Sequence, residues 1–164
     1  MLGQTMRVYK NMITATLKEN KYDLSFEQYV MMMILNMEKG PTQQDLANQL
    51  QKDKSSILRH TDVLIKKQYV ARITDKNDKR MKKLYLTAKG SETVVRLKAI
   101  ARQVESRLLL EINASDLNTF MTVLGKIHLN GGLDDEFCCP NDNLENQEQS
   151  INSNEVNKQK NEND

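Results

Sequence analysis

Apolar residues recur at three- and four-residue steps through most of the first 130 positions, a spacing that predicts helices buried along one face. The first helix is expected over residues 3–20. A second begins at a capping-box sequence, residues 25–28. It ends near residue 38, because Gly40 and Pro41 follow and proline cannot continue a helix.

A short helix, a tight turn and a longer helix come next. Thr42 is placed to cap the short helix and Asp53 the longer one, which we expect to run to about residue 68. At 100° per residue the longer helix has an apolar and a polar face. Its expected apolar face consists of Ile57, Leu58, Thr61, Leu64 and Ile65. Its expected polar face consists of Ser55, Ser56, Arg59, His60, Asp62, Val63 and Lys66.

The period then changes from that of a helix to that of a strand. Residues 69–74 and 81–86 alternate and contain β-branched side chains, so we expect two strands. The polar segment 75–80 between them predicts a hairpin turn with a charged tip. The fold class that follows is mainly α with one small β-hairpin.

Two further helices and a tail complete the chain. Thr87 is expected to cap a long helix that reaches about Ile112, and Ser115 with Asp116 to open a last one. The last helix should bury Leu117, Phe120, Met121, Leu124 and Ile127. Residues 133–164 are rich in Asn, Gln, Glu and Asp and hold few apolar side chains. We expect that acidic tail to be disordered, because little burial offsets its ordering entropy.

The net charge of +2 hides an asymmetry along the chain. Residues 1–130 hold 22 basic and 13 acidic side chains, a net of +9, whereas residues 131–164 hold 2 and 9, a net of −7. Between Lys52 and Lys89 there are 12 basic and 4 acidic residues, a net of +8. Such a basic segment indicates either a polyanionic partner or an ordinary solvated surface.

Several classes of protein are disfavoured by motifs that the sequence lacks. It has no apolar run of about 18 residues for a membrane span and no apolar N-terminal stretch of a signal peptide. With only two cysteines, a disulfide scaffold is not expected. We expect the protein to be located in the cytosol. Neither a Gly-rich phosphate loop, a nucleophile elbow nor a cluster of metal ligands is present. We therefore expect no enzyme, no cofactor and no metal site.

The helix from Asp53 has features of a helix that reads DNA. Arg59 can make a forked contact with guanine, and Ser55, Ser56 and His60 suit phosphates or base edges. Lysines contact phosphates and give affinity without sequence information. The alternative is an ordinary amphipathic helix with a solvated face. The hairpin tip favours DNA, because a narrow minor groove attracts basic side chains. The tip carries Lys76, Lys79 and Arg80.

The stretch from Thr42 to Gly90 resembles the multiple antibiotic resistance regulator (MarR) family. The resemblance lies in Thr42-Gln-Gln-Asp-Leu-Ala, Asp53-Lys-Ser-Ser-Ile, Leu64-Ile-Lys-Lys-Gln-Tyr-Val, Asp75-Lys-Asn-Asp-Lys-Arg and Leu84-Tyr-Leu-Thr-Ala-Lys-Gly. It implies a winged helix-turn-helix with a DNA-binding lobe over about 40–90. It further implies that Asp78 holds the Arg80 guanidinium in the wing. Gln68 departs from the family, which usually has glycine there. The expected DNA-binding residues are Thr42, Gln43, Lys54, Ser55, Ser56, Arg59, His60, Lys66, Asp78, Lys79 and Arg80.

The long helix carries a coiled-coil-like seam at steps of three and four residues, which indicates a surface covered by a second copy. The alternative is a helix buried within its own chain. The resemblance favours a homodimer in which helices over about 3–20 and 87–130 build the interface. The expected interface residues are Met6, Tyr9, Ile13, Val94, Leu97, Ala101, Val104, Leu108, Phe120 and Leu124.

The resemblance implies a possible signal, because members of the family often release DNA when a small molecule binds or a cysteine is oxidised. Cys138 and Cys139 are adjacent in the tail, where they are either a redox or metal pair or incidental. The methionines of the second helix either line a ligand cleft or fill the core. They are Met31, Met32, Met33 and Met37.

The function expected from these patterns is a bacterial transcriptional regulator that binds a pseudo-palindromic DNA operator as a homodimer. We expect it to act as a repressor rather than as an activator. The alternative is a winged-helix module that binds another protein and does not bind DNA sequence-specifically. A further possibility is that the acidic tail, residues 133–164, folds onto the basic surface and inhibits binding.

Overall fold

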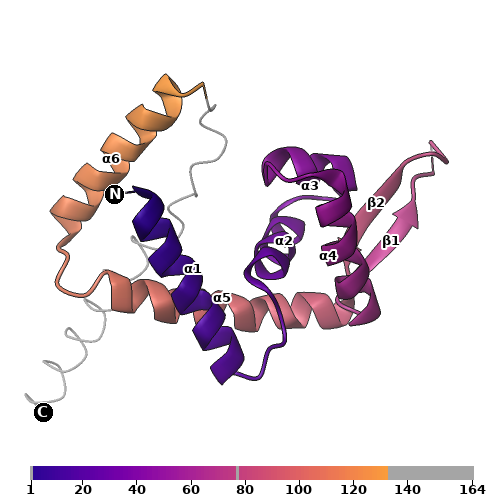
Figure 1. Cartoon of the computed structure of the whole chain (residues 1–164), viewed down its shortest axis with the longest axis horizontal. Coiled ribbons are helices and arrows are strands. Elements are labelled where there is room, and N and C mark those ends of the chain that lie inside the picture. The colour runs from indigo at the N-terminus through magenta and orange to yellow at the C-terminus, as the bar shows by residue number, and fades with distance from the viewer. Residues whose placement is uncertain (1, 77, 133–164) are drawn as a thin grey trace, which may run out of the picture. The chain divides into compact units, whose positions relative to one another are not determined.

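Six helices and one two-stranded sheet are present in the part of the chain that the structure, a computed structural model, describes, which is residues 2–76 and 78–132. The chain divides into two compact units, residues 1–110 and residues from 111 onward. The mainly α fold with a small hairpin is confirmed (Figure 1). The elements are α1 (Leu2–Glu19), α2 (Phe26–Met37), α3 (Gln43–Gln49), α4 (Lys54–Lys66), β1 (Val70–Thr74), β2 (Lys82–Leu86), α5 (Ala88–Leu108) and α6 (Ala114–Asn130).

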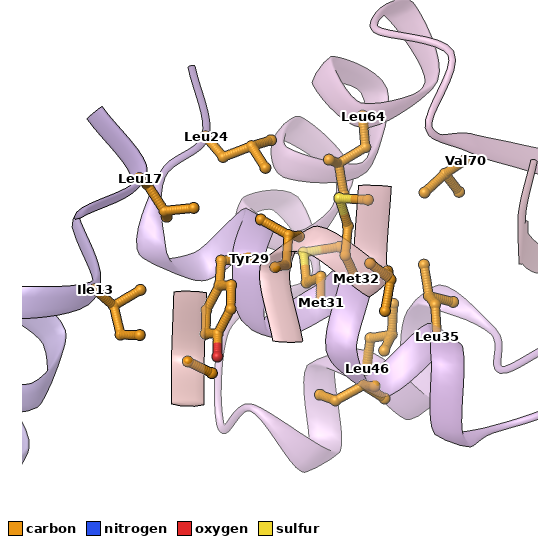
Figure 2. Close-up of a cluster of buried hydrophobic side chains, with 14 of the residues drawn as sticks. Ile13, Leu17, Leu24, Tyr29, Met31, Met32, Leu35, Leu46, Leu64 and Val70 are labelled. Atoms are coloured by element: carbon orange, nitrogen blue, oxygen red, sulfur yellow. The ribbon is translucent and has the colours of Figure 1, made fainter. Parts of the chain in front are cut away.

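One hydrophobic core holds the first unit together, with α2 at its centre. Met31 and Met32 of α2 are fully buried among side chains from α1, α3, α4 and the hairpin (Figure 2). These two methionines therefore fill the core, whereas Met37 is exposed. Because every element of the unit contributes to this cluster, α4 and the hairpin are fixed to one support. The cluster includes Ile13, Leu17, Leu46, Ile57, Leu64, Val70, Leu84, Val94, Leu97 and Val104.

The apolar seam of α5 is buried within a single chain, which corrects the argument that a second copy must cover it. Helices α1 and α2 both pack against α5, and α1 crosses it in Figure 1. This arrangement buries four of the five seam residues and leaves only Leu108 half-buried. The seam residues buried in this way are Val94, Leu97, Ala101 and Val104, together with Ile13 of α1.

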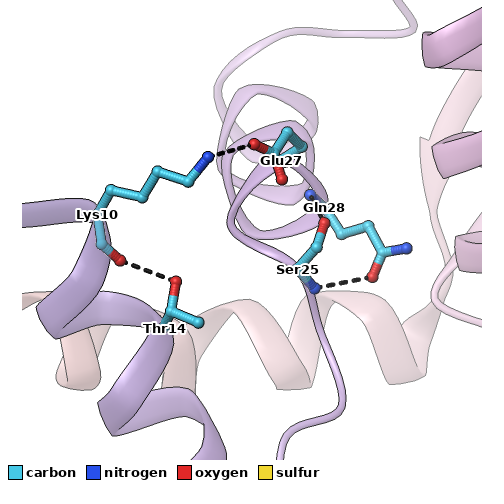
Figure 3. Close-up of polar contacts among 5 residues, drawn as sticks. All are labelled: Lys10, Thr14, Ser25, Glu27 and Gln28. Atoms are coloured by element: carbon cyan, nitrogen blue, oxygen red, sulfur yellow. Dashed lines mark hydrogen bonds and ion pairs between the residues drawn. The ribbon is translucent and has the colours of Figure 1, made fainter. Parts of the chain in front are cut away.

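The expected helix starts are confirmed at four positions. Ser25 and Gln28 form a reciprocal capping box at the start of α2 (Figure 3). Thr42, Asp53 and Thr87 are the N-caps of α3, α4 and α5. In each case the side chain accepts a hydrogen bond from a backbone N–H that the helix leaves unpaired.

The start of α6 differs from expectation. Its N-cap is Asn113 and not Ser115, because the Asn113 side chain accepts the backbone N–H of Asp116 at 2.8 Å. The helix was also expected to bury its apolar side chains, yet none of its described residues is buried. Phe120 is 48% exposed, and Met121 and Ile127 are exposed as well.

Two helices end earlier than their periodicity predicts. α4 ends at Lys66 rather than near residue 68, and α5 ends at Leu108 rather than near Ile112. Both ends are followed by a residue in the left-handed conformation, Gln68 at φ 63° and Glu111 at φ 64°. Chain reversal at such a residue stops a helix even where the apolar spacing continues.

Gln68 occupies the position where the family usually has glycine, and its positive φ explains that preference. A side chain in this conformation costs about 1–2 kcal/mol, because Cβ approaches the following carbonyl oxygen. We expect Gln68→Gly to raise the free energy of unfolding by about 1 kcal/mol, measured by urea denaturation. The matched control is Gln103→Gly in the interior of α5, which should lower stability by about 1 kcal/mol. Destabilisation by both substitutions would contradict the role assigned to Gln68.

Candidate nucleic-acid interface

Helices α3 and α4 form a helix-turn-helix. Leu46 and Ala47 of α3 are buried, and the chain reverses at Gln51, whose φ is 48°. Asp53 then caps α4, so only a few residues separate the two helices. The short turn keeps α3 packed against α4 at a fixed angle.

The back of α4 is anchored in the core of the first unit. Ile57, Thr61 and Leu64 are at most 1% exposed. The Thr61 hydroxyl, which could not be buried unpaired without cost, donates to the Ile57 carbonyl oxygen at 2.7 Å. These three positions fix which side of the helix faces solvent.

The outward face of α4 is polar and basic, with one departure from the expected pattern. Ser55, Arg59 and Lys66 are exposed. Leu58 was expected on the buried face, but it is 40% exposed. At 100° per residue it lies about 100° from Ile57, far enough round the helix to leave the core.

Two of the expected reading residues are less free than the others. Ser56 and His60 are half-buried, and His60 lies on the side of α4 that faces α2. On α4, the exposed members of the expected set are therefore Lys54, Ser55, Arg59 and Lys66, without Ser56 and His60.

The N-cap of α4 also holds the first outward side chain. The Asp53 carboxylate accepts the Ser55 hydroxyl and, at 2.7 Å, the Ser56 backbone N–H. These hydrogen bonds, that of Ser55 first, hold the pKa of Asp53 below its usual range. Since the Ser55 hydroxyl donates to Asp53, its oxygen remains free to accept a hydrogen bond from outside.

The hairpin is antiparallel and joins α4 through an ion pair. Val70 pairs with Leu86, and both strands turn one face to the core, where Val70 and Leu84 are buried. Arg72 of β1 reaches Asp62 of α4 at 2.7 Å. This contact links the hairpin to the outward side of the helix, so their relative position is set by a charged pair as well as by the core.

The hairpin is braced further along its length. Lys83 of β2 pairs with Asp75 across the sheet at 2.7 Å. The segment before α3 also joins it, because the Leu84 N–H donates to the Pro41 carbonyl at 2.9 Å. Asp75 raises the pKa of Lys83 through this hydrogen bond, so the lysine stays charged.

The tip of the hairpin is organised by Asp78, though not through the contact that was expected. Its carboxylate accepts the backbone N–H of Arg80 at 2.9 Å and does not hold the Arg80 guanidinium. The Asp78 N–H in turn donates to the Asp75 carboxylate at 3.1 Å. Asp78 thus shapes the turn, and the side chains of Lys79 and Arg80 remain exposed.

The hairpin meets α5 at a tight joint. The Thr87 hydroxyl donates to the Gln68 carbonyl at 2.6 Å and accepts the Gly90 N–H at 3.0 Å. A Cβ on Gly90 would lie 2.0 Å from the Tyr69 carbonyl oxygen, so only glycine fits there. The Leu-Thr-x-x-Gly sequence is therefore a packing requirement of this joint.

Comparison with known proteins agrees with this geometry. Residues 24–82, which include the helix-turn-helix and most of the hairpin, match the model of the MarR family. Residues 24–82 form a MarR family domain.

Solved MarR structures share the fold over most of the chain. A MarR transcriptional regulator from Methanosarcina mazei Go1 is 25% identical with a TM-score of 0.72, and the match covers 79% of this chain and 92% of that one. Wild-type E. coli MarR in its apo form is 20% identical with a TM-score of 0.67, covering 77% and 96%. A MarR family regulator from Silicibacter pomeroyi is 22% identical with a TM-score of 0.66, covering 79% and 86%. The chain therefore has the winged-helix fold of MarR transcriptional regulators.

A cavity of about 230 Å³ lies behind α4 of the MarR fold, where periodicity alone did not indicate one. Lys10 at its edge pairs with Glu27 at 2.7 Å and lies 5.4 Å from the centre of the Phe26 ring (Figure 3 shows the ion pair). Lys10 accordingly lowers the pKa of Glu27. No local pattern in the sequence indicates this cavity, because its lining comes from helices and a turn that are separate along the chain. The lining residues are Lys10, Phe26, Glu27, Val30, Leu50, Lys52, Ile57 and His60.

The remaining expected residues are placed as follows. Thr42 caps α3, and Gln43 is half-buried with its side-chain nitrogen buried and unpaired within the described residues.

Cys138 and Cys139 lie outside the residues that the structure describes. Within the described ranges, no group of three or more His, Cys, Asp or Glu side chains could hold a metal ion, and no helix is long and apolar enough to cross a membrane.

The depressed pKa of Asp53 predicts a pH-dependent cap on α4. A group whose pKa is lowered by folding stabilises fully above its unfolded pKa, and this contribution is lost as pH falls through the folded pKa. Asp53→Ala should therefore lower the midpoint of urea unfolding most at neutral pH, and progressively less at acid pH. Asp53→Asn is the control, since an amide caps at every pH. A deficit in Asp53→Ala that stays constant down to acid pH would show that the charge of Asp53 contributes nothing.

Proposed function

We propose that this chain is a sequence-specific DNA-binding transcriptional regulator that acts as a homodimer on a pseudo-palindromic operator, and that it represses transcription. The observation that carries the proposal is that α4 and the hairpin, the two parts that would contact DNA, are fixed to the same core and to each other. Arg59 lies on the outward face of α4, Arg80 lies at the hairpin tip, and the Arg72–Asp62 ion pair connects the two elements. The fold of MarR transcriptional regulators supports it.

Each part suits a different groove of duplex DNA. A helix with an anchored back and an outward face of short or hydrogen-bonding side chains fits the major groove, where its N-terminal half contacts bases. Ser55 can accept from a base amino group, and Arg59 can donate to guanine in a forked contact. The exposed Lys79 and Arg80 suit the minor groove beside it. Lys54 and Lys66 add phosphate contacts.

A homodimer is supported by apolar surface that one chain leaves uncovered. On α6, Phe120, Leu124 and Ile127 share one face at steps of four and three residues, and the helix has no buried residue in its described part. On α1, Met6 is 61% exposed. A two-fold dimer doubles the reading helix and matches an operator with half-sites about one helical turn apart.

A small-molecule signal is the mode of regulation that the cavity supports. Its walls come from α1, α2 and α4, so a ligand held there contacts the reading helix from behind. Binding releases DNA only if the ligand prefers a position of α4 that does not fit the groove.

Arg59→Ala and Arg80→Ala test the assignment of the reading residues. Loss of a forked guanine contact should weaken binding to a duplex selected from random sequences by about 10- to 100-fold for Arg59→Ala. Arg80→Ala should also weaken it, and wild-type affinity should fall steeply with salt. The measurement is a gel shift at two salt concentrations.

The control is Arg102→Ala, which removes the same charge from α5, outside the proposed DNA interface. Wild-type affinity for specific and random duplexes in both reading variants would refute the assignment. Absence of any preferred duplex, with little effect of salt, would favour a winged-helix module that binds protein.

Substitution on α6 tests the dimer. Phe120→Ser should lower the fraction of dimer seen by sedimentation and weaken binding to a two-half-site duplex, because it removes apolar contact area from the interface. Ile73→Ser, at a similarly exposed apolar residue of the hairpin, should leave the dimer intact. An unchanged dimer in Phe120→Ser would remove α6 from the interface.

A further inference from the structure

Leu58 is an apolar side chain within the polar outward surface of α4. Lys54 lies one turn before it and Asp62 one turn after it, on the same side of the helix. Asp62 is held by Arg72 of the hairpin at 2.7 Å. Leu58 therefore lies in the N-terminal half of the helix, on the side that the hairpin joins.

The core does not account for this leucine. Ile57, Thr61 and Leu64 already anchor α4, and Leu58 is 40% exposed. A single exposed leucine needs no explanation by itself. What singles out Leu58 is its position, since the N-terminal half of a reading helix is the part that contacts bases.

The thymine methyl group is the apolar feature of the major-groove edge, and apolar side chains contact it. Ser55 and Arg59 beside Leu58 offer an acceptor and donors, so they cannot recognise a methyl group. We propose that Leu58 packs on the methyl group of a thymine and so specifies an A·T pair at one position in each half-site. This assignment rests on the proposed DNA-binding function and adds a base preference to it.

Val63 provides a comparison on the same helix. It is 37% exposed, almost as much as Leu58. It lies five residues further toward the C-terminus, outside the N-terminal half of the helix that contacts bases, and about 140° from Leu58 round the helix. Loss of exposed apolar surface at Val63 should not change base preference.

Deoxyuridine substitution removes the methyl group and leaves the hydrogen-bonding edge of the base unchanged. In a duplex that the wild-type protein itself selects from random sequences, each thymine of one half-site is replaced in turn by deoxyuridine. At one position, wild-type affinity should fall about fourfold, the effect of one buried methyl group. Leu58→Ala should bind the parent duplex more weakly and lose nothing further at that position, and Val63→Ala should respond as the wild type does.

Leucine and alanine both favour helices, so Leu58→Ala should keep its structure, which unfolding and circular dichroism verify. Leu58→Met has a side chain of similar volume, so its affinity should again fall when deoxyuridine replaces thymine at that position. If Leu58→Ala shows the same deoxyuridine loss as the wild type, or if no thymine is sensitive, the assignment of Leu58 is overturned while specific DNA binding stands. If selection returns no preferred duplex, the proposed function itself fails.

Discussion

The structure depends on the burial of one side of α4. Ile57, Thr61 and Leu64 enter the same core as Met31 and Met32 of α2, so the opposite side of α4 has one defined orientation toward solvent. A close-packed core does not let such a helix roll without opening voids. The choice of side chains that are free to contact a partner therefore follows from packing on the hidden side.

The hairpin extends this constraint to a second element. The joint at Thr87 and Gly90 fixes where β2 enters α5, and the Arg72–Asp62 pair ties β1 to α4. These contacts are a hydrogen bond, a steric limit at glycine and a charged pair, which are physically independent. A rigid relation between helix and hairpin matters for a DNA reader, because both must fit grooves whose spacing is set by the duplex.

Local signals predicted the elements well. Ser25, Thr42, Asp53 and Thr87 cap helices as their sequences indicate, since capping depends on residues three positions apart. Helix ends were predicted less well, because left-handed residues such as Gln68 stop a helix whose apolar spacing continues. At the site, the outward Arg59 followed from periodicity, but the partner of Asp78 did not, because it depends on the turn geometry of the hairpin tip.

The sequence alone determined the order of elements, the N-caps of α2, α3, α4 and α5, the basic segment and the resemblance to the MarR family, because these depend on neighbours along the chain. Tertiary structure decided which apolar faces are covered. The seam of α5 and the face of α6 have similar patterns, yet Leu97 in the seam is buried where α1 and α2 pack on α5, whereas Phe120 on α6 is exposed. Periodicity shows that a face is apolar, but only the arrangement of distant segments in space determines what covers it.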